Sequence, residues 1–339
     1  MKRIILSSNN IENESLEFTE KQIKNIYYQA QTELELELQE YLDQFSESDT
    51  AKQNELNDTY KKYRNGIIAY AVYKTLKTNY EKWRINQIMT GVKWENIKGT
   101  LANSLLSASL LAENEINSHI FNSYYLNYNQ IIYQFEKGAL LAPLIPIYSK
   151  KSLKKLLKKN SSLLPQYNIN KSDSIEWNKK KITSVIMQGI LKGESIPKIA
   201  KRIRKVANMN YNASIRNART ASGAAANKAK IEGFKAIQKK GFAVKKRWIS
   251  MVDNKTRHEH RLLMGQTVNL NESFKINGYE IKYPCDPEAA PEMIYNCRCS
   301  VVGIIEGYEN VINAYQYKTN PNLNGMTLEE WKNSKSIYE

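Results

Sequence analysis

The sequence contains little of the residue types that mark several classes of protein. Its three cysteines cannot build a disulfide framework, which favours a reducing, intracellular setting. With only 14 glycines, the composition favours helices over a barrel or a collagen-like repeat. The most apolar stretch, residues 97–116, is interrupted by Asn, Lys and Glu and falls short of the ~18 apolar residues that a membrane span needs. The first ten residues hold an apolar run of three, too short for an export signal.

Acidic residues are scarce in the middle of the chain. Residues 151–250 contain 25 Lys and Arg but four Asp and Glu, whereas residues 1–60 contain five Lys and Arg and 13 Asp and Glu. The net charge of +16 is therefore concentrated in the central third. Such a field attracts a polyphosphate or a strongly acidic protein surface. A basic face that is merely solvated is the alternative interpretation.

The N-terminal half reads as helix. Residues 11–60 are rich in helix formers, and this holds for "TELELELQ" (32–39), although its period-two alternation would also suit a strand. Residues 60–138 continue as a long helical arm, in which apolar residues recur at spacings of three and four. His119 stands alone there, which predicts a hydrogen-bonded histidine on a helix face rather than a ligand.

A change in pattern near residue 150 suggests a domain boundary. Residues 139–170 contain three prolines and a Ser/Asn cluster, which break regular structure. After them we expect a helix to about Leu191, a second with Pro197 in its first turn, and an Ala-rich third that ends at Gly241.

A small sheet is expected to follow these helices. Residues 243–253 and 297–305 read as strands, and Asn277-Gly278 between β-formers predicts a hairpin. The fold class is therefore α+β. We predict a helical arm over 1–149, acidic at its start, a basic domain over 150–307, and a polar tail over 308–339 with a final helix in "TLEEWKNS".

Two basic segments are candidates for binding a polyanion. "KKSLKKLLKK" (150–159) places lysines on one side of a helix and leucines on the other, as a cationic amphipathic helix does. "KIAKRIRKVA" (198–207) repeats this pattern. Neither has interleaved aromatic residues, so duplex DNA backbone is a better match than stacked single strands, with an anionic membrane or an acidic protein as alternatives. The candidate DNA-binding residues are Lys151, Lys154, Lys155, Lys158, Lys159, Lys201, Arg202, Arg204 and Lys205.

Most of the soft metal ligands in the chain gather near its C-terminal end. In extended chain, Cys297 and Cys299 would share one face, as would His258 and His260. Four N and S ligands in a reduced protein suit tetrahedral Zn²⁺, although two small cysteines packed in a sheet would give the same sequence. The candidate metal ligands are His258, His260, Cys285, Cys297 and Cys299.

The same residues leave a catalytic alternative open. Cys297 or Cys299 as nucleophile would need His260 as base and Asp253 to orient it, and a nuclease would use His260 with Arg298 as a phosphate clamp. The sequence supplies no oxyanion-hole signature, Walker loop, dinucleotide-binding glycine pattern or acidic metal-binding run. We therefore expect a protein that binds rather than an enzyme.

Residues 175–305 resemble the Mu F-like head-morphogenesis proteins of tailed bacteriophages. "IMQGILKGESIPKIAKRI" and Arg219-Thr220 are similar to the upstream part of that family. The closing Asn296-Cys297-Arg298-Cys299 is the most specific match, and Cys285 stands where relatives often have Gly. The other matching residues are Trp248, Asp253, Thr256, Arg257, His260, Gly265, Gln266, Phe274, Tyr283, Pro284, Asp286 and Pro287.

The resemblance implies a minor capsid component that acts without catalysis. Such a protein is expected to associate with the portal protein, with scaffold or major capsid protein as further partners, and to contact double-stranded DNA during head assembly, packaging or ejection. It would reside inside the capsid of the virion after assembly in the host cytoplasm. Trp248, Asp253, Thr256, Arg257 and Arg298 would then form a structural motif that ties the loops of the sheet together.

Overall fold

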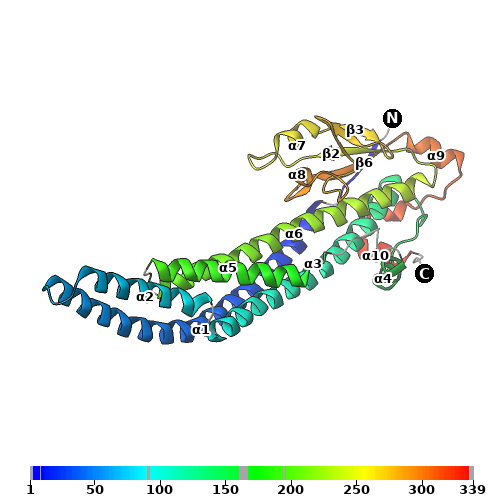
Figure 1. Cartoon of the computed structure of the whole chain (residues 1–339). Coiled ribbons are helices and arrows are strands. Elements are labelled where there is room, and N and C mark those ends of the chain that lie inside the picture. The colour runs from blue at the N-terminus through cyan, green and yellow to red at the C-terminus, as the bar shows by residue number, and fades with distance from the viewer. Residues whose placement is uncertain are drawn as a thin grey trace. The chain divides into compact units, whose positions relative to one another are not determined.

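A computed structural model describes residues 3–7, 9–89, 92–159, 167–192, 194 and 196–335 (Figure 1). The chain forms two compact units. Unit 1 comprises residues 1–21, 114–167 and 215–339, and unit 2 comprises residues 22–113 and 168–214. The long helices α1 (Asn9–Arg64), α3 (Val92–Ala139) and α6 (Ile196–Gln238) contribute to both. These units do not follow the predicted boundaries at 149/150 and 307/308.

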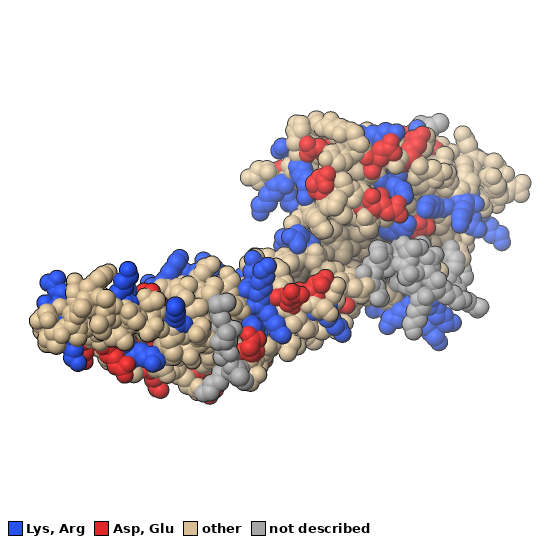
Figure 2. Space-filling view, viewed as in Figure 1, with Lys and Arg blue, Asp and Glu red and all other residues tan. Residues whose placement is uncertain are grey.

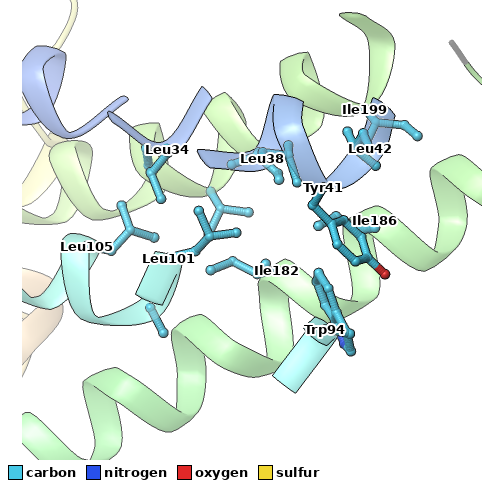
Figure 3. Packing of buried hydrophobic residues seen from close by; sticks show 14 of the residues in the cluster. Leu34, Leu38, Tyr41, Leu42, Trp94, Leu101, Leu105, Ile182, Ile186 and Ile199 are labelled. Atoms are coloured by element: carbon cyan, nitrogen blue, oxygen red, sulfur yellow. The ribbon is translucent and has the colours of Figure 1, made fainter. Parts of the chain in front are cut away.

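Unit 2 is helical, and its core comes from leucine and isoleucine residues spaced by one helical turn. It contains α2 (Tyr70–Met89) and α5 (Lys171–Leu191) beside parts of the three long helices. Leu34 and Leu38 of α1 and Ile182 and Ile186 of α5 point into one cluster, where Trp94 of α3 closes the end (Figure 3). Burial of these side chains supplies most of the driving force for the unit.

The "TELELELQ" segment shows how helix propensity outweighs a period-two pattern. A strand would place Leu34, Leu36 and Leu38 on the same face. In α1, Leu34 and Leu38 are buried, whereas Leu36 is 70% exposed, as expected for residues at i, i+2 and i+4 of a helix. The predicted helix over 11–60 is therefore confirmed.

The α6 helix differs from the prediction of two separate helices. Residues 196–238 form one helix, because no Gly or Pro interrupts the chain between Pro197 and Gly223. The N-cap of α5 is Asn170, whose side chain accepts the amide of Asp173. His119 is buried in unit 1 between Ser15 and Ser222, and burial lowers its pKa to about 4, so the predicted hydrogen-bonded histidine is confirmed.

Unit 1 contains a four-stranded antiparallel sheet in the order β1-β6-β2-β3. The strands are β1 (Arg3–Leu6), β2 (Val244–Ile249), β3 (Thr267–Asn269) and β6 (Ser300–Glu306). β4 (Phe274–Ile276) and β5 (Tyr279–Ile281) form the hairpin predicted at Asn277-Gly278, where both residues have positive φ. The α+β prediction is confirmed, and β1, which pairs with the last strand, was not predicted.

The C-terminal half of α6 packs on the central strand of this sheet. A Cβ at Gly303 of β6 would lie 2.6 Å from the ring of Phe234 on α6, so only glycine permits this approach. On another side of α6, a Cβ at Gly233 would lie 2.8 Å from Ile131 of α3. Helix and sheet therefore meet at close range along the part of β6 that follows the cysteines.

The predicted polar tail is an integral part of unit 1. It forms α9 (Tyr308–Ala314), a 3₁₀ turn (Pro321–Asn324) and α10 (Leu328–Asn333), the last confirming the helix predicted in "TLEEWKNS". Two short helices, α7 (His258–Leu263) and α8 (Pro291–Ile294), precede β3 and β6, and α4 (Lys150–Lys159) follows α3. In the part of the chain that the structure describes, no helix is long and apolar enough to cross a membrane.

A buried carboxylate holds the tail in place. Glu136 of α3 accepts the Trp331 indole N–H at 2.9 Å, the Lys335 ammonium at 2.7 Å, and the amides of Leu144 and Ile145 at 2.8 and 3.0 Å. The side chains of Glu136 and Lys335 are 0% and 1% exposed. Such a buried charge is tolerated only because every oxygen is paired.

We predict that Glu136→Ala destabilises the protein strongly. The substitution leaves the Lys335 charge and three N–H donors buried without an acceptor, which costs about 3–5 kcal/mol of unfolding free energy. Glu329→Ala is the matched control, because it removes an exposed carboxylate from a surface pair with Lys332 in the same tail. Urea denaturation measures both, and equal midpoints for the two variants would show that Glu136 does not anchor the tail.

Candidate functional site

The short helix α7, which follows the loop after β2, places His260 in the interior of unit 1. Trp248 at the end of β2 is fully buried, and its indole N–H donates to the Ser250 hydroxyl at 3.0 Å. Ser250 in turn donates to the backbone carbonyl of His260. The Trp248 ring also packs edge-on against the imidazole, with centroids 5.5 Å apart. These contacts fix both the backbone and the ring of His260.

His260 meets two cysteine sulfurs. Its Nδ1 lies 3.5 Å from Cys297 Sγ and 3.4 Å from Cys299 Sγ, and the three residues are 1%, 5% and 6% exposed. The backbone N–H of Cys299 donates to Cys297 Sγ at 3.4 Å. The neighbouring Cys285 thiol and burial raise the pKa of Cys297, and Cys297 with burial raises that of Cys299. The pair of cysteines that was predicted to share a face does so.

The other two predicted ligands lie differently. His258 is exposed and is not part of this group. Cys285 is buried beside it, where its thiol donates to the Cys297 carbonyl at 3.4 Å. Its φ of 62° is a backbone conformation that favours glycine. Of the predicted ligands, the structure thus brings together His260, Cys297 and Cys299, with Cys285 adjacent.

The predicted structural motif forms a clasp between two loops near the cluster. Arg298 donates two hydrogen bonds to Asp253, at 2.6 and 2.7 Å, and this bidentate pair holds the pKa of Asp253 well below its usual range. Thr256 donates to Asp253 and to the Met251 carbonyl, and Arg257 donates to the Tyr295 carbonyl. The loop after β2 is thereby tied to the segment that leads into β6.

Asn227 on α6 joins this segment to the helix, and sequence reasoning missed it. Its side-chain amide is 1% exposed and lies within 3.3 Å of the Pro284 and Cys299 carbonyls, while its Oδ1 accepts the Val301 amide at 2.9 Å. A Cβ at Gly223, one turn earlier, would lie 2.7 Å from the Cys285 sulfur. Single Asn and Gly residues in an Ala-rich helix carry no motif signal.

The catalytic arrangement does not form. The Asp253 carboxylate is bound to Arg298, Thr256 and the Lys255 amide, and His260 Nε2 is buried without a hydrogen-bond partner among the described residues. The thiols near His260 have raised pKa values, which disfavours the nucleophilic thiolate. The nuclease-like and cysteine-nucleophile alternatives therefore have no support in this geometry.

The predicted DNA-binding residues fall into two groups, one in each unit. On α4 in unit 1, Lys151, Lys154 and Lys155 are exposed, and basic side chains gather where Figure 1 places this helix (Figure 2). The side chains of Lys158 and Lys159 lie outside the described residues.

On α6 in unit 2, the basic residues have different surroundings. Lys201 and Lys205 are exposed. Arg202 pairs with Glu194 at 2.5 and 2.6 Å, and Arg204 pairs with Glu35. The two arginines are thus already engaged by carboxylates, and the lysines are the cations available to a partner.

The cluster lies within a region that matches a known protein family. Residues 180–302 match the family described as Phage Mu protein F like protein. The chain is also similar to minor head protein GP7 of Bacillus phage SPP1, with 26% identity over 257 residues that cover 74% of this chain and 77% of GP7. Residues 180–302 are thus a Mu F-like region, and the chain resembles a phage minor head protein over most of its length. The resemblance noted from the cysteine motif is confirmed.

A second relative matches a smaller part of the chain. It is the NAD(+)–arginine ADP-ribosyltransferase EFV of Enterococcus faecalis, with 31% identity over 126 residues, or 37% of this chain. The chain spans only 26% of the length of EFV. No solved structure matches the chain.

Proposed function

We propose that this minor head protein acts as a non-enzymatic assembly factor that docks on the portal protein and contacts double-stranded DNA. The alignment with GP7 over most of both chains carries this proposal. The buried, mutually bonded His260, Cys297, Cys299 and Asn227 support a mechanical role. On this proposal the protein resides inside the capsid of the virion after assembly in the host cytoplasm.

The exposed lysines support contact with DNA backbone. Among the residues that the structure describes, no carboxylate pairs with Lys151, Lys154 or Lys155, and the three lie on one short helix, so their charges can neutralise phosphates. Contacts to phosphates alone do not distinguish one base sequence from another, which suits a protein that contacts genomic DNA of any sequence.

We predict that Lys151→Ala/Lys154→Ala/Lys155→Ala weakens binding to duplex DNA and makes it less dependent on salt. The slope of log K against log [salt] should become shallower by about 0.9 for each lost phosphate contact. Lys62→Ala/Lys74→Ala/Lys77→Ala removes the same charge from exposed positions outside 151–250 and is the control. Fluorescence anisotropy at several salt concentrations measures both, and identical slopes for the two variants would exclude α4 as a DNA contact.

The turn between α1 and α2 offers a surface for the portal. This turn surface exposes the large apolar side chains of Tyr60, Ile67, Tyr70, Val72 and Leu76. Exposed apolar patches on a protein mark interaction sites. In the sequence, the basic residues Lys61, Lys62, Arg64, Lys74 and Lys77 lie among these apolar residues, and Asp58 pairs with Lys61 at 3.2 Å. An apolar centre with a basic rim fits an acidic protein surface.

We predict that Ile67→Ser/Tyr70→Ser reduces binding to the portal protein of the same phage at least tenfold. Leu36→Ser is the control, because Leu36 is an exposed leucine of α1 that is far along the helix from this turn. Analytical ultracentrifugation of the purified chain with portal oligomers measures the complex. Binding to scaffold or major capsid protein in place of the portal, or equal loss in the control, would contradict this assignment.

A further inference from the structure

We propose that Cys285, His260, Cys297 and Cys299 hold one Zn²⁺ ion that locks the loops of unit 1. This site goes beyond the assembly role proposed above and does not depend on it. The donor set suits zinc, since three sulfurs and one imidazole nitrogen form a common structural site. All four residues are at most 6% exposed, as expected for a closed site and not for one that admits substrate.

The spacing of the donor atoms agrees with tetrahedral coordination. Zn–S bonds of about 2.3 Å and a Zn–N bond of about 2.0–2.1 Å place N and S about 3.5 Å apart at the tetrahedral angle. His260 Nδ1 lies 3.5 Å from Cys297 Sγ and 3.4 Å from Cys299 Sγ. The ligand atoms of these three residues all lie within 4.8 Å of one another. Thus three corners of the tetrahedron are already in place.

Cys285 is the donor that completes the set. It is buried beside Cys297, and its thiol donates to the Cys297 carbonyl at 3.4 Å, so ligation requires the thiol to leave this hydrogen bond. Its backbone has φ 62°, where glycine would fit with less strain, and its sulfur packs against Gly223 of α6. Binding of a metal by its sulfur would offset the strain of a cysteine at this position.

The sulfurs form hydrogen bonds with their surroundings. The Cys299 amide donates to Cys297 Sγ at 3.4 Å, and the Cys299 thiol donates to the Ser250 hydroxyl at 3.6 Å. Hydrogen bonds of this kind orient the ligands around a metal. The ion would join α7, the segment before α8 and the segment that leads into β6, and Arg298 of this last segment also pairs with Asp253 in the loop after β2.

The test is elemental analysis of the full-length chain, purified without a histidine tag and reconstituted with Zn²⁺. We expect one zinc per chain in the wild type and in His258→Ala, which removes an exposed histidine from the same helix. His260→Ala and Cys299→Ser should each retain less than a tenth of this. Folded wild-type protein without bound zinc, or full occupancy in His260→Ala, would overturn the proposal.

Metal exchange on the unmutated protein covers the case in which a ligand variant does not fold. Substitution with Co²⁺ should give a tetrahedral spectrum with thiolate charge-transfer bands, and a chelator should lower Tm reversibly. Cys285→Gly should weaken zinc binding at least tenfold and lower the intensity of the charge-transfer band. If Cys285→Gly binds zinc as tightly as the wild type, Cys285 is not a ligand, and a cobalt spectrum without thiolate bands overturns the whole site.

Discussion

The side-chain amide of Asn227 is the interaction on which the cysteine-bearing part of this protein depends. From the middle of α6 it reaches two backbone carbonyls, at Pro284 and Cys299, and one amide, at Val301. These groups are buried, and each would cost about 1–3 kcal/mol if left without a partner. Nearby, Lys230 donates to Ser300 at 2.7 Å, and Thr220 accepts the Asn296 amide at 3.1 Å. A single helix thereby fixes the chain on both sides of Cys297 and Cys299, and the position of His260 relative to them follows.

Sequence patterns predicted the elements whose causes are local. Helix propensity in "TELELELQ" and the Asn277-Gly278 turn act over a few residues, and both features appear where they were expected. Patterns could not predict β1, because Arg3–Leu6 is a short strand whose partner, β6, lies at the other end of the chain. The same applies to the two units, since each is assembled from segments far apart in sequence. For the site, residue type identified His260 and the two cysteines, whereas Asn227, Gly223 and Ser250 have roles that only tertiary contacts define.

The buried motif residues and the exposed lysines of the chain have different roles. The residues that carry the family resemblance are mostly buried or paired with each other, as with Trp248, Asp253 and Arg298. Lys151, Lys154 and Lys155 of α4 and Lys201 and Lys205 of α6 are exposed, whereas Arg202 and Arg204 are held by Glu194 and Glu35. Buried polar groups that satisfy one another specify a single geometry for the loops, and exposed charges remain free for a polyanion.

Native-state hydrogen exchange on Asn227→Ala tests most directly whether α6 organises the cysteine segment. Loss of the amide should accelerate exchange at residues 284–286 and 296–301, and leave the protection of α5 and of the first half of α6 in unit 2 unchanged. The Val301 amide should respond most, because its acceptor is removed. Wild-type protection of residues 296–301 in a folded variant would contradict a dependence of this segment on Asn227.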